Sequence, residues 1–372
     1  MLRSLVFIFV YLPLAFFTQI IEYTPWERVV PSEGIPENIR LRKANNNLDL
    51  VHFEGRYYLA FRNAPNHFAS KKTRIYVLSS IDLENWELEK EIHLKNDLRE
   101  PRFVVYRNTL FFYYFEGGRK FWKFEPKHLY MTSKKKGEPW TKDQLTSMDG
   151  YIPWRLRINN DLLYLSAYYG KNAYNKEPVD LRLLTSDNGL SFHTISEAPQ
   201  LLHPKGIGEG EFLFDSHGDI WGVARSEFDG SYTFHANRDS LHIWKVNYSE
   251  YKFDSSLMFT KEGYVFLIAR RNLDGDGRYY RKPGKHLKNL LRYSFTKKTT
   301  AIYILNKATL TWRHLKDLEG TGDTAFPALI ENEDGTFTLM NYSSDLTKRS
   351  KNWIRGQLGK TYIYKTVLKV DF

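Results

Sequence analysis

Alternating apolar and polar positions run through most of the chain and fall into six similar units. Each unit opens on polar or charged residues, continues as an alternating aromatic and aliphatic run, turns at Gly, Asn or Asp, and returns as a second alternating run with a polar end. Alternation predicts strands with one face in a core, and such turns predict tight hairpins. The six hairpins are expected to begin near residues 47, 97, 151, 208, 252 and 322.

Most hairpins are followed by a third apolar run, and several units add a segment that opens on an aromatic residue. Third strands are expected at 73–80, 128–133, 180–186, 240–246, 300–305 and 361–367, and fourth strands near Trp86, Trp140, Phe192 and Trp312. Units of four strands at this spacing are typical of β-propeller blades. No sustained helical period follows residue 21. The predicted fold is therefore all-β: a six-bladed β-propeller over residues 22–372.

The last unit ends at its third strand, a few residues before Phe372. Its outer strand must then come from elsewhere in the chain, and residues 26–30 are the expected donor. Pairing this N-terminal strand onto the final blade would close the ring and remove a free sheet edge.

Residues 1–21 have the pattern of an export signal, with Arg3 ahead of the apolar run 5–17. No cleavage site with small residues follows, so an uncleaved N-terminal anchor is the alternative. Either way, export to the periplasm, the cell surface or the medium is expected. The chain has no cysteine, which excludes disulfides and thiolate zinc sites. The histidines lack metal-binding spacing, and we expect no metal or cofactor.

The net charge of +11 leaves two interpretations open. Lys and Arg are scattered along the sequence without a long basic helix or arm, so no nucleic-acid partner is expected. The excess is either a soluble basic surface or, in part, arginine that lines a site for an anionic substrate. We expect a monomer.

Charged and phenolic residues recur at the start of the first strand and at the end of the second strand of each unit. In a propeller these two ends meet at one mouth of the central channel, so the six polar sets should converge there. They favour carbohydrate chemistry, which needs clustered carboxylates; a structural ion-pair network and a ligand-binding surface without chemistry are the alternatives. The candidate catalytic residues are Asp49, Glu100, Glu211 and Asp323, and the candidate substrate-binding residues are Arg62, Arg99, Arg155, Glu209, Arg225, Arg270 and Tyr342.

Five segments give the sequence a resemblance to the sialidase superfamily of six-bladed propellers. "SSIDLENWE" (79–87) and "TSDNGLSFH" (185–193) resemble Asp boxes, in which an Asp caps the turn between the third and fourth strands and an aromatic residue packs into the blade. "DLREPRF" (97–103), "GDTAFPALI" (322–330) and "MNYSSD" (340–345) are similar to further segments of such proteins. The resemblance covers about residues 40–370.

The resemblance implies specific roles. Sialidases hold the sugar carboxylate with three arginines, use a Tyr activated by a Glu as nucleophile, and use an Asp as acid/base. Arg99, Arg155, Arg225 and Arg270 are the candidates for the first role, Glu211 for the partner carboxylate and Asp49 for the acid, while Phe326 stands where the similar segment carries a Tyr.

A second likeness, to five-bladed furanosidases, implies a trio of carboxylates instead, and Asp49, Glu100 and either Glu209 or Glu211 match it. The sequence thus predicts an exported sialidase-like glycoside hydrolase acting on a carbohydrate at the channel mouth. A non-catalytic glycan-binding propeller and a structural cell-envelope protein are the alternatives.

Overall fold

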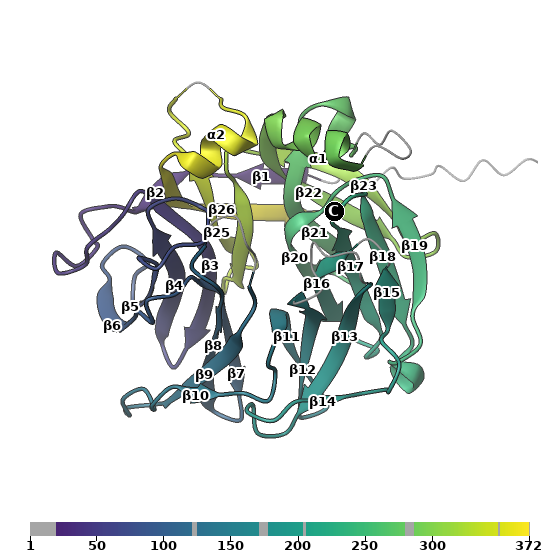
Figure 1. The fold of residues 1–372 in the computed structure, drawn as a ribbon, viewed down its shortest axis with the longest axis horizontal. Coiled ribbons are helices and arrows are strands. Elements are labelled where there is room, and N and C mark those ends of the chain that lie inside the picture. The colour runs from purple at the N-terminus through teal and green to yellow at the C-terminus, as the bar shows by residue number, and fades with distance from the viewer. Residues whose placement is uncertain are drawn as a thin grey trace, which may run out of the picture.

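A computed structural model of the chain describes residues 20–120, 125–170, 178–203, 206–279, 286–348 and 350–371. These residues form six antiparallel sheets arranged around a common axis (Figure 1). The all-β class and the six-bladed propeller predicted from the sequence are confirmed. We number the blades 1 to 6 in the order of their first strands.

The first three blades are continuous in sequence. Their strands are β3 (Ala44–Phe53), β4 (Arg56–Ala64), β5 (Arg74–Ser80) and β6 (Glu87–Ile92) in blade 1; β7 (Leu98–Tyr106), β8 (Thr109–Glu116), β9 (His128–Lys135) and β10 (Gln144–Leu145) in blade 2; and β11 (Tyr151–Asn159), β12 (Leu162–Tyr169), β13 (Val179–Ser186), β14 (His193–Thr194) and β15 (Leu201–His203) in blade 3.

The last three blades carry the helical insertions. Their elements are β16 (Ile207–Phe214), β17 (Ile220–Ser226), β18 (Ser231–Ala236), η2 (Arg238–Ser240) and β19 (Lys245–Ser249) in blade 4; β20 (Asp254–Lys261), β21 (Tyr264–Asn272), η3 (Gly275–Gly277), α1 (His286–Phe295), β22 (Lys298–Asn306) and β23 (Thr311–Leu318) in blade 5; and β24 (Ala325–Glu331), β25 (Phe337–Ser344), α2 (Trp353–Leu358) and β26 (Thr361–Asp371) in blade 6, which β1 (Ile20–Tyr23) and β2 (Glu27–Val30) complete.

The ring is closed by strands from both ends of the chain. The innermost strands contact one another in the order β3, β7, β11, β16, β20 and β24, and β24 contacts β3 again. In blade 6, β2 pairs with β26, as expected for residues 26–30, and β1 pairs with the far part of β26, where Ile21 lies opposite Val370. Pairing on β26 thus covers the edge that the C-terminal strand would leave free.

Apolar side chains fill the space between neighbouring blades. Six clusters of buried residues occur in the described part of the chain, and each draws most of its members from two adjacent blades. Trp86 and Phe192, near which fourth strands were predicted, belong to two of these clusters. The apolar positions of the alternating pattern are therefore those buried between blades. The free edge of each innermost strand lines the central axis.

One prediction about local structure is wrong. The third strand of blade 4 is β18, whereas residues 240–246 form a connection and the start of β19. There Trp244 stacks on Phe234 with ring centroids 3.9 Å apart, so it is the aromatic residue that precedes the fourth strand. Two short helices were not predicted from the sequence: α1 and α2 lie between the second and third strands of blades 5 and 6 (Figure 1).

The two segments that resemble Asp boxes form similar turns between third and fourth strands. In blade 1 the Asp82 carboxylate accepts the backbone N–H groups of Glu84 and Asn85 at 2.9 and 2.8 Å. In blade 3 the side chain that accepts equivalent bonds is Asn188, from the N–H groups of Leu190 and Ser191. The second turn is therefore capped by an amide rather than by the aspartate that the resemblance implied.

Most of the predicted N-terminal signal, residues 1–19, lies outside the described residues. Its last two positions, Ile20 and Ile21, belong to β1. Neither helix of the described ranges has the length and apolar composition needed to cross a bilayer.

Candidate functional site

Every innermost strand contains a one-residue β-bulge near its start. The register shifts fall between Asn46 and Leu48, Arg99 and Arg102, Pro153 and Arg155, Gly208 and Glu211, Asp254 and Leu257, and Ala325 and Ala328. At four bulges a polar residue has a left-handed backbone: Asn47, Glu100, Glu209 and Ser255, with φ between 44° and 52°. This conformation is costly for residues other than glycine. Because a bulge re-aims a side chain, the repeated bulges turn these four groups toward one place.

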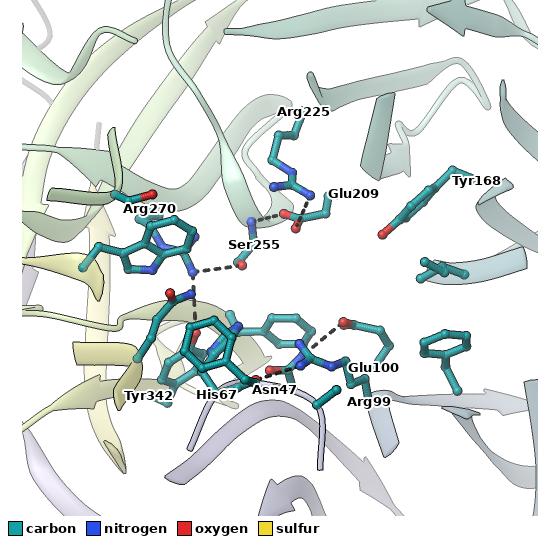
Figure 2. A pocket seen from close by; sticks show the side chains of 18 of the residues that line it. Asn47, His67, Arg99, Glu100, Tyr168, Glu209, Arg225, Ser255, Arg270 and Tyr342 are labelled. Atoms are coloured by element: carbon teal, nitrogen blue, oxygen red, sulfur yellow. Dashed lines mark hydrogen bonds and ion pairs between the residues drawn. The ribbon is translucent and has the colours of Figure 1, made fainter. Parts of the chain in front are cut away.

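That place is a cavity of about 450 Å³, which we call the central cavity. Figure 2 shows Glu209 and Arg225 on one side of it, Glu100 and Asn47 on the facing side, and Tyr168 directed at the space between. The lining consists of Asn47, His67, Phe68, Ala69, Arg99, Glu100, Phe115, Ile152, Tyr168, Glu209, Arg225, Ser255, Arg270, Leu290, Ser294, Phe326, Tyr342, Trp353 and Gln357.

Glu209 is a carboxyl group with a strongly shifted acidity. Burial raises its pKa, the Arg225 guanidinium at 3.1 Å opposes that rise, and the nearby Asp254 carboxylate adds to it, so that the pKa of Glu209 is raised to about 7. The backbone N–H of Ser255 donates to Glu209 at 2.5 Å. Glu209 thus holds a proton over much of the range below neutral pH, in contrast to an ordinary exposed glutamate.

Glu100 presents a second carboxyl group to the cavity. Its Oε1 atom accepts a hydrogen bond from the Asn47 side chain at 3.0 Å, while its Oε2 atom is buried without a hydrogen bond. Burial raises the pKa of Glu100, although Arg102 and Arg99 act in the opposite direction. Oε2 forms an ion pair with the Arg102 guanidinium at 3.9 Å, which is too long for a hydrogen bond.

A hydrogen-bonded chain forms the wall beside blade 6. Tyr342 donates to Asp323 at 3.2 Å, and the other Asp323 oxygen lies 2.8 Å from Nδ1 of His67. Burial alone would raise the pKa of Asp323, but His67 and neighbouring donors hold it below its ordinary value. Burial also raises the pKa of Tyr342 well above its usual range. Arg270 lies 3.5 Å from the Tyr342 hydroxyl and 3.4 Å from the Ser255 hydroxyl.

The three arginines of the cavity all have carboxylate partners within the protein. Arg99 binds Asp97 at 2.5 Å, and Arg270 binds Asp254 at 3.2 Å. Arg225 binds both Glu209 and Glu227, the latter at 2.8 Å. These partners fix the guanidinium groups in place, and the cavity is therefore lined by nearly balanced charge.

A separate ion-pair network lies deeper along the same strands. Glu211 is fully buried between Arg155 at 2.5 Å and Arg157 at 2.9 Å. The Asp49 carboxylate accepts the backbone N–H of Phe103 at 2.7 Å and lies 3.8 Å from Arg155. We call the set Asp49, Arg102, Arg155, Arg157 and Glu211 the channel network.

The structure therefore divides the predicted site residues into two groups. Those that line the central cavity are Arg99, Glu100, Glu209, Arg225, Arg270 and Tyr342. Those that do not line it are Asp49, Arg62, Arg155, Glu211 and Asp323. The expectation of one shared hollow is thus wrong for the second group: Asp49, Arg155 and Glu211 belong to the channel network, Arg62 is buried against Asp97 at 2.7 Å, and Asp323 stands behind Tyr342. Catalytic and binding roles for individual residues stay predictions.

Several lining residues were not among the sequence-derived candidates. Asn47 is the bulged residue of β3, and alternation alone cannot show that it replaces Asp49 at the mouth. His67 comes from the β4–β5 loop, and Trp353 and Gln357 come from α2. The described residues contain no group of three or more His, Asp and Glu side chains that could hold a metal ion.

Comparisons with known proteins relate the chain to solved propellers. No family model matches the sequence, and no curated protein matches it. A protein of unknown function from Dyadobacter fermentans DSM 18053 is similar, with a TM-score of 0.69 and 13% identity, over 94% of this chain and 99% of that one.

Two sialidases are also similar in structure. The Trypanosoma rangeli sialidase gives a TM-score of 0.60 at 11% identity, over 88% of this chain, which spans 55% of the length of that enzyme. The NanB sialidase of Streptococcus pneumoniae gives 0.58 at 12% identity, over 88% of this chain and 68% of that one. At these identities the likeness concerns the fold: the chain is a six-bladed β-propeller whose structural neighbours include sialidases.

Proposed function

We propose that the protein is a glycoside hydrolase whose active site is the central cavity. One observation carries this proposal: two buried carboxyl groups, Glu100 and Glu209, face each other across one cavity, and both have a raised pKa. Most glycoside hydrolases use a pair of carboxyl groups that flank the scissile bond, one of them held protonated by its surroundings.

The two groups differ in a way that suggests their roles. Glu209, with a pKa of about 7, donates its proton to the glycosidic oxygen as the bond from that oxygen to the anomeric carbon breaks. Glu100, once ionised, accepts a proton from the water that attacks the anomeric carbon. The Glu100 side chain lines the central cavity, so the attacking water would bind beside it there.

The rest of the lining suits a sugar with a negative charge. Phe115, Tyr168, Phe326 and Trp353 offer aromatic surface to the apolar faces of sugar rings. Arg99, Arg225 and Arg270 offer guanidinium groups that recognise carboxylates and sulfates well. The T. rangeli sialidase binds sialic acid, an anionic sugar.

The test is hydrolysis of a panel of fluorogenic glycosides that includes neutral, uronic and sialic acid derivatives. We expect turnover of at least one acidic glycoside, with the activity lost in Glu100→Gln and Glu209→Gln variants that remain folded. Asp49→Asn is the matched control, because it removes a carboxylate of the channel network. Equal activity of all four proteins would overturn the assignment.

A glycan-binding propeller without catalysis is the second candidate. It is favoured by the ion pairs that already engage all three cavity arginines, and by the Tyr342 hydroxyl, whose partners are Asp323 and Arg270 rather than a glutamate. Binding on a glycan array with no turnover of any glycoside in the panel would select this function.

A further inference from the structure

A second hollow, of about 410 Å³, has a lining whose members among the described residues are all basic. We call it the basic pocket, and its lining consists of Arg42, Lys71, Lys72, Arg74, His93, Lys95 and Arg119. These residues come from four chain segments: the approach to β3, the β4–β5 loop with the start of β5, the β6–β7 connection, and the residues after β8. Basic residues that are scattered in the sequence are thus collected by the fold into one concave place.

The charge of the basic pocket is poorly balanced. Arg74 is paired with Glu91 at 2.5 Å. Over the described ranges, no ion pair is found for Arg42, Lys71, Lys72, Lys95 or Arg119, all of which are exposed. Like charges gathered in a hollow produce a positive potential that attracts anions, and a ligand with several negative groups would relieve their repulsion.

The basic pocket adjoins the central cavity along three segments of chain. Residues 67–69 line the cavity, while Lys71 and Lys72 of the same loop line the basic pocket. Arg99 and Lys95 are divided in the same way, as are Phe115 and Arg119. An extended chain spans at most about 3.6 Å per residue, so these pairs lie within roughly 7 to 14 Å of each other. A ligand of a few sugar units can therefore occupy both hollows.

We propose that the basic pocket is a subsite for the anionic groups of an acidic polysaccharide, sulfated or uronic, of which one sugar occupies the central cavity. The occupant of the cavity rests on the proposed function, whereas the anion site does not. A polysaccharide is the occupant we propose rather than a nucleic acid, because the described part of the lining has no Phe, Tyr or Trp side chain to stack on bases. A membrane surface fits less well, because the pocket is concave and its described lining residues are all basic.

The experiment measures binding by isothermal titration calorimetry on the full chain. The probes are a heparin-derived hexasaccharide, a polygalacturonate hexasaccharide and neutral maltohexaose. A Lys71→Ala, Lys72→Ala, Lys95→Ala triple variant is compared with a control triple variant, Lys135→Ala, Lys136→Ala, Lys142→Ala, which loses the same charge around the β9–β10 connection. We expect at least one acidic probe to bind, with affinity lowered by about tenfold or more in the first variant alone, and the affinity to fall with added salt. The acidic probe that binds distinguishes sulfate from carboxylate.

Equal affinity of the first variant and the wild type would overturn the proposal. Tighter binding of a DNA duplex or of vesicles rich in phosphatidylserine than of either acidic hexasaccharide would overturn it in favour of those partners. The outcome of this binding experiment is independent of the outcome of the hydrolysis test. If no glycoside is hydrolysed but acidic probes still need the three lysines, the proposed function fails and the anion site stands. If glycosides are hydrolysed and the lysines have no effect on binding, the anion site alone fails.

Discussion

Glu209 and Glu211 lie two residues apart on the same strand, β16, yet the fold places them in opposite environments. Glu211 is fully buried between two guanidinium groups of the channel network. Glu209 stands at a bulge on the wall of the central cavity, where burial outweighs Arg225 and raises its pKa to about 7. The comparison shows that the identity of a residue does not decide its role here. Its position relative to the bulge does, because that position determines whether the carboxylate is neutralised by the protein or is left to act on a ligand.

The largest expected effect is on catalysis in the cavity. Replacing Glu209 by Gln removes the proton donor while keeping the shape of the side chain, so we expect kcat on an acidic glycoside to fall by about 10²- to 10⁴-fold. The melting temperature should change little. Steady-state kinetics and thermal unfolding of the purified variant check both parts, and an unchanged kcat would remove Glu209 from the mechanism.

The corresponding change in the channel network should affect folding instead. Glu211→Gln removes the carboxylate that pairs with buried Arg155 and with half-buried Arg157, and breaking a buried ion pair costs about 3 to 5 kcal/mol. Urea unfolding followed by tryptophan fluorescence measures this loss. A variant as stable as the wild type would show that the channel network does not stabilise the fold. The contrast drawn between the channel network and the central cavity would then be weaker.

The raised pKa of Glu209 also predicts how the stability depends on pH. Because the pKa of Glu209 is raised from 4.5 to about 7, the folded protein keeps a proton that the unfolded chain releases in this range. The free energy of unfolding should therefore decrease as pH rises from about 4.5 to 7, and this decrease should be smaller in Glu209→Gln.

The same protonation governs the rate. Activity that needs protonated Glu209 should fall by about tenfold per pH unit above pH 7. Urea titrations and kcat profiles between pH 4 and 9 test the two statements. A stability curve for Glu209→Gln that is parallel to that of the wild type would contradict the raised pKa.

We expect the smallest effect at Arg102, where the channel network approaches Glu100 of the central cavity. Arg102 lies over the rings of Trp154 and Phe326, at 4.7 and 4.4 Å from their centroids, and burial lowers its pKa to about 10. None of its side-chain nitrogens has a hydrogen bond in the described part of the chain. Arg102→Met should therefore change the stability by no more than about 1 kcal/mol, because the lost attraction is offset by relief of desolvation.

Arg102 nevertheless lowers the pKa of Glu100, so its removal should raise that pKa further. Carboxyl ¹³C chemical shifts measured during a pH titration check this direction. A lower pKa of Glu100 in Arg102→Met would mean that the two groups do not interact as their separation of 3.9 Å indicates.

The number of blades and the closure by an N-terminal strand could be predicted because they depend on local signals. Hairpin turns and alternation are properties of a few adjacent residues, and they report burial between blades directly. No local sequence pattern marks the positions of the bulges. The sequence therefore placed Asp49, Glu209 and Glu211 together at the mouth. In the structure Asn47 and Glu209 line the central cavity at the bulges, whereas Asp49 and Glu211 lie deeper along the same strands.

Contacts between residues far apart in the sequence could not be predicted from the alternation of apolar and polar residues. Helices α1 and α2 have 10 and 6 residues, too few to show a sustained period, and yet Leu290 and Trp353 from them form part of the cavity wall. The basic pocket joins Arg42 to Arg119 across two blades. Its members looked scattered because their proximity is created by the ring itself.

The six bulges have a consequence for how such a protein can change. The extra residue of a bulge is excluded from the regular pairing of its strand, so the neighbouring sheet hydrogen bonds do not depend on its side chain, provided that the residue tolerates the left-handed backbone. Asn47, Glu100, Glu209 and Ser255 could each be exchanged for side chains of other chemistry while the wheel around them stays intact. The ligand preference of this architecture can thus change stepwise, by one substitution at one bulge at a time.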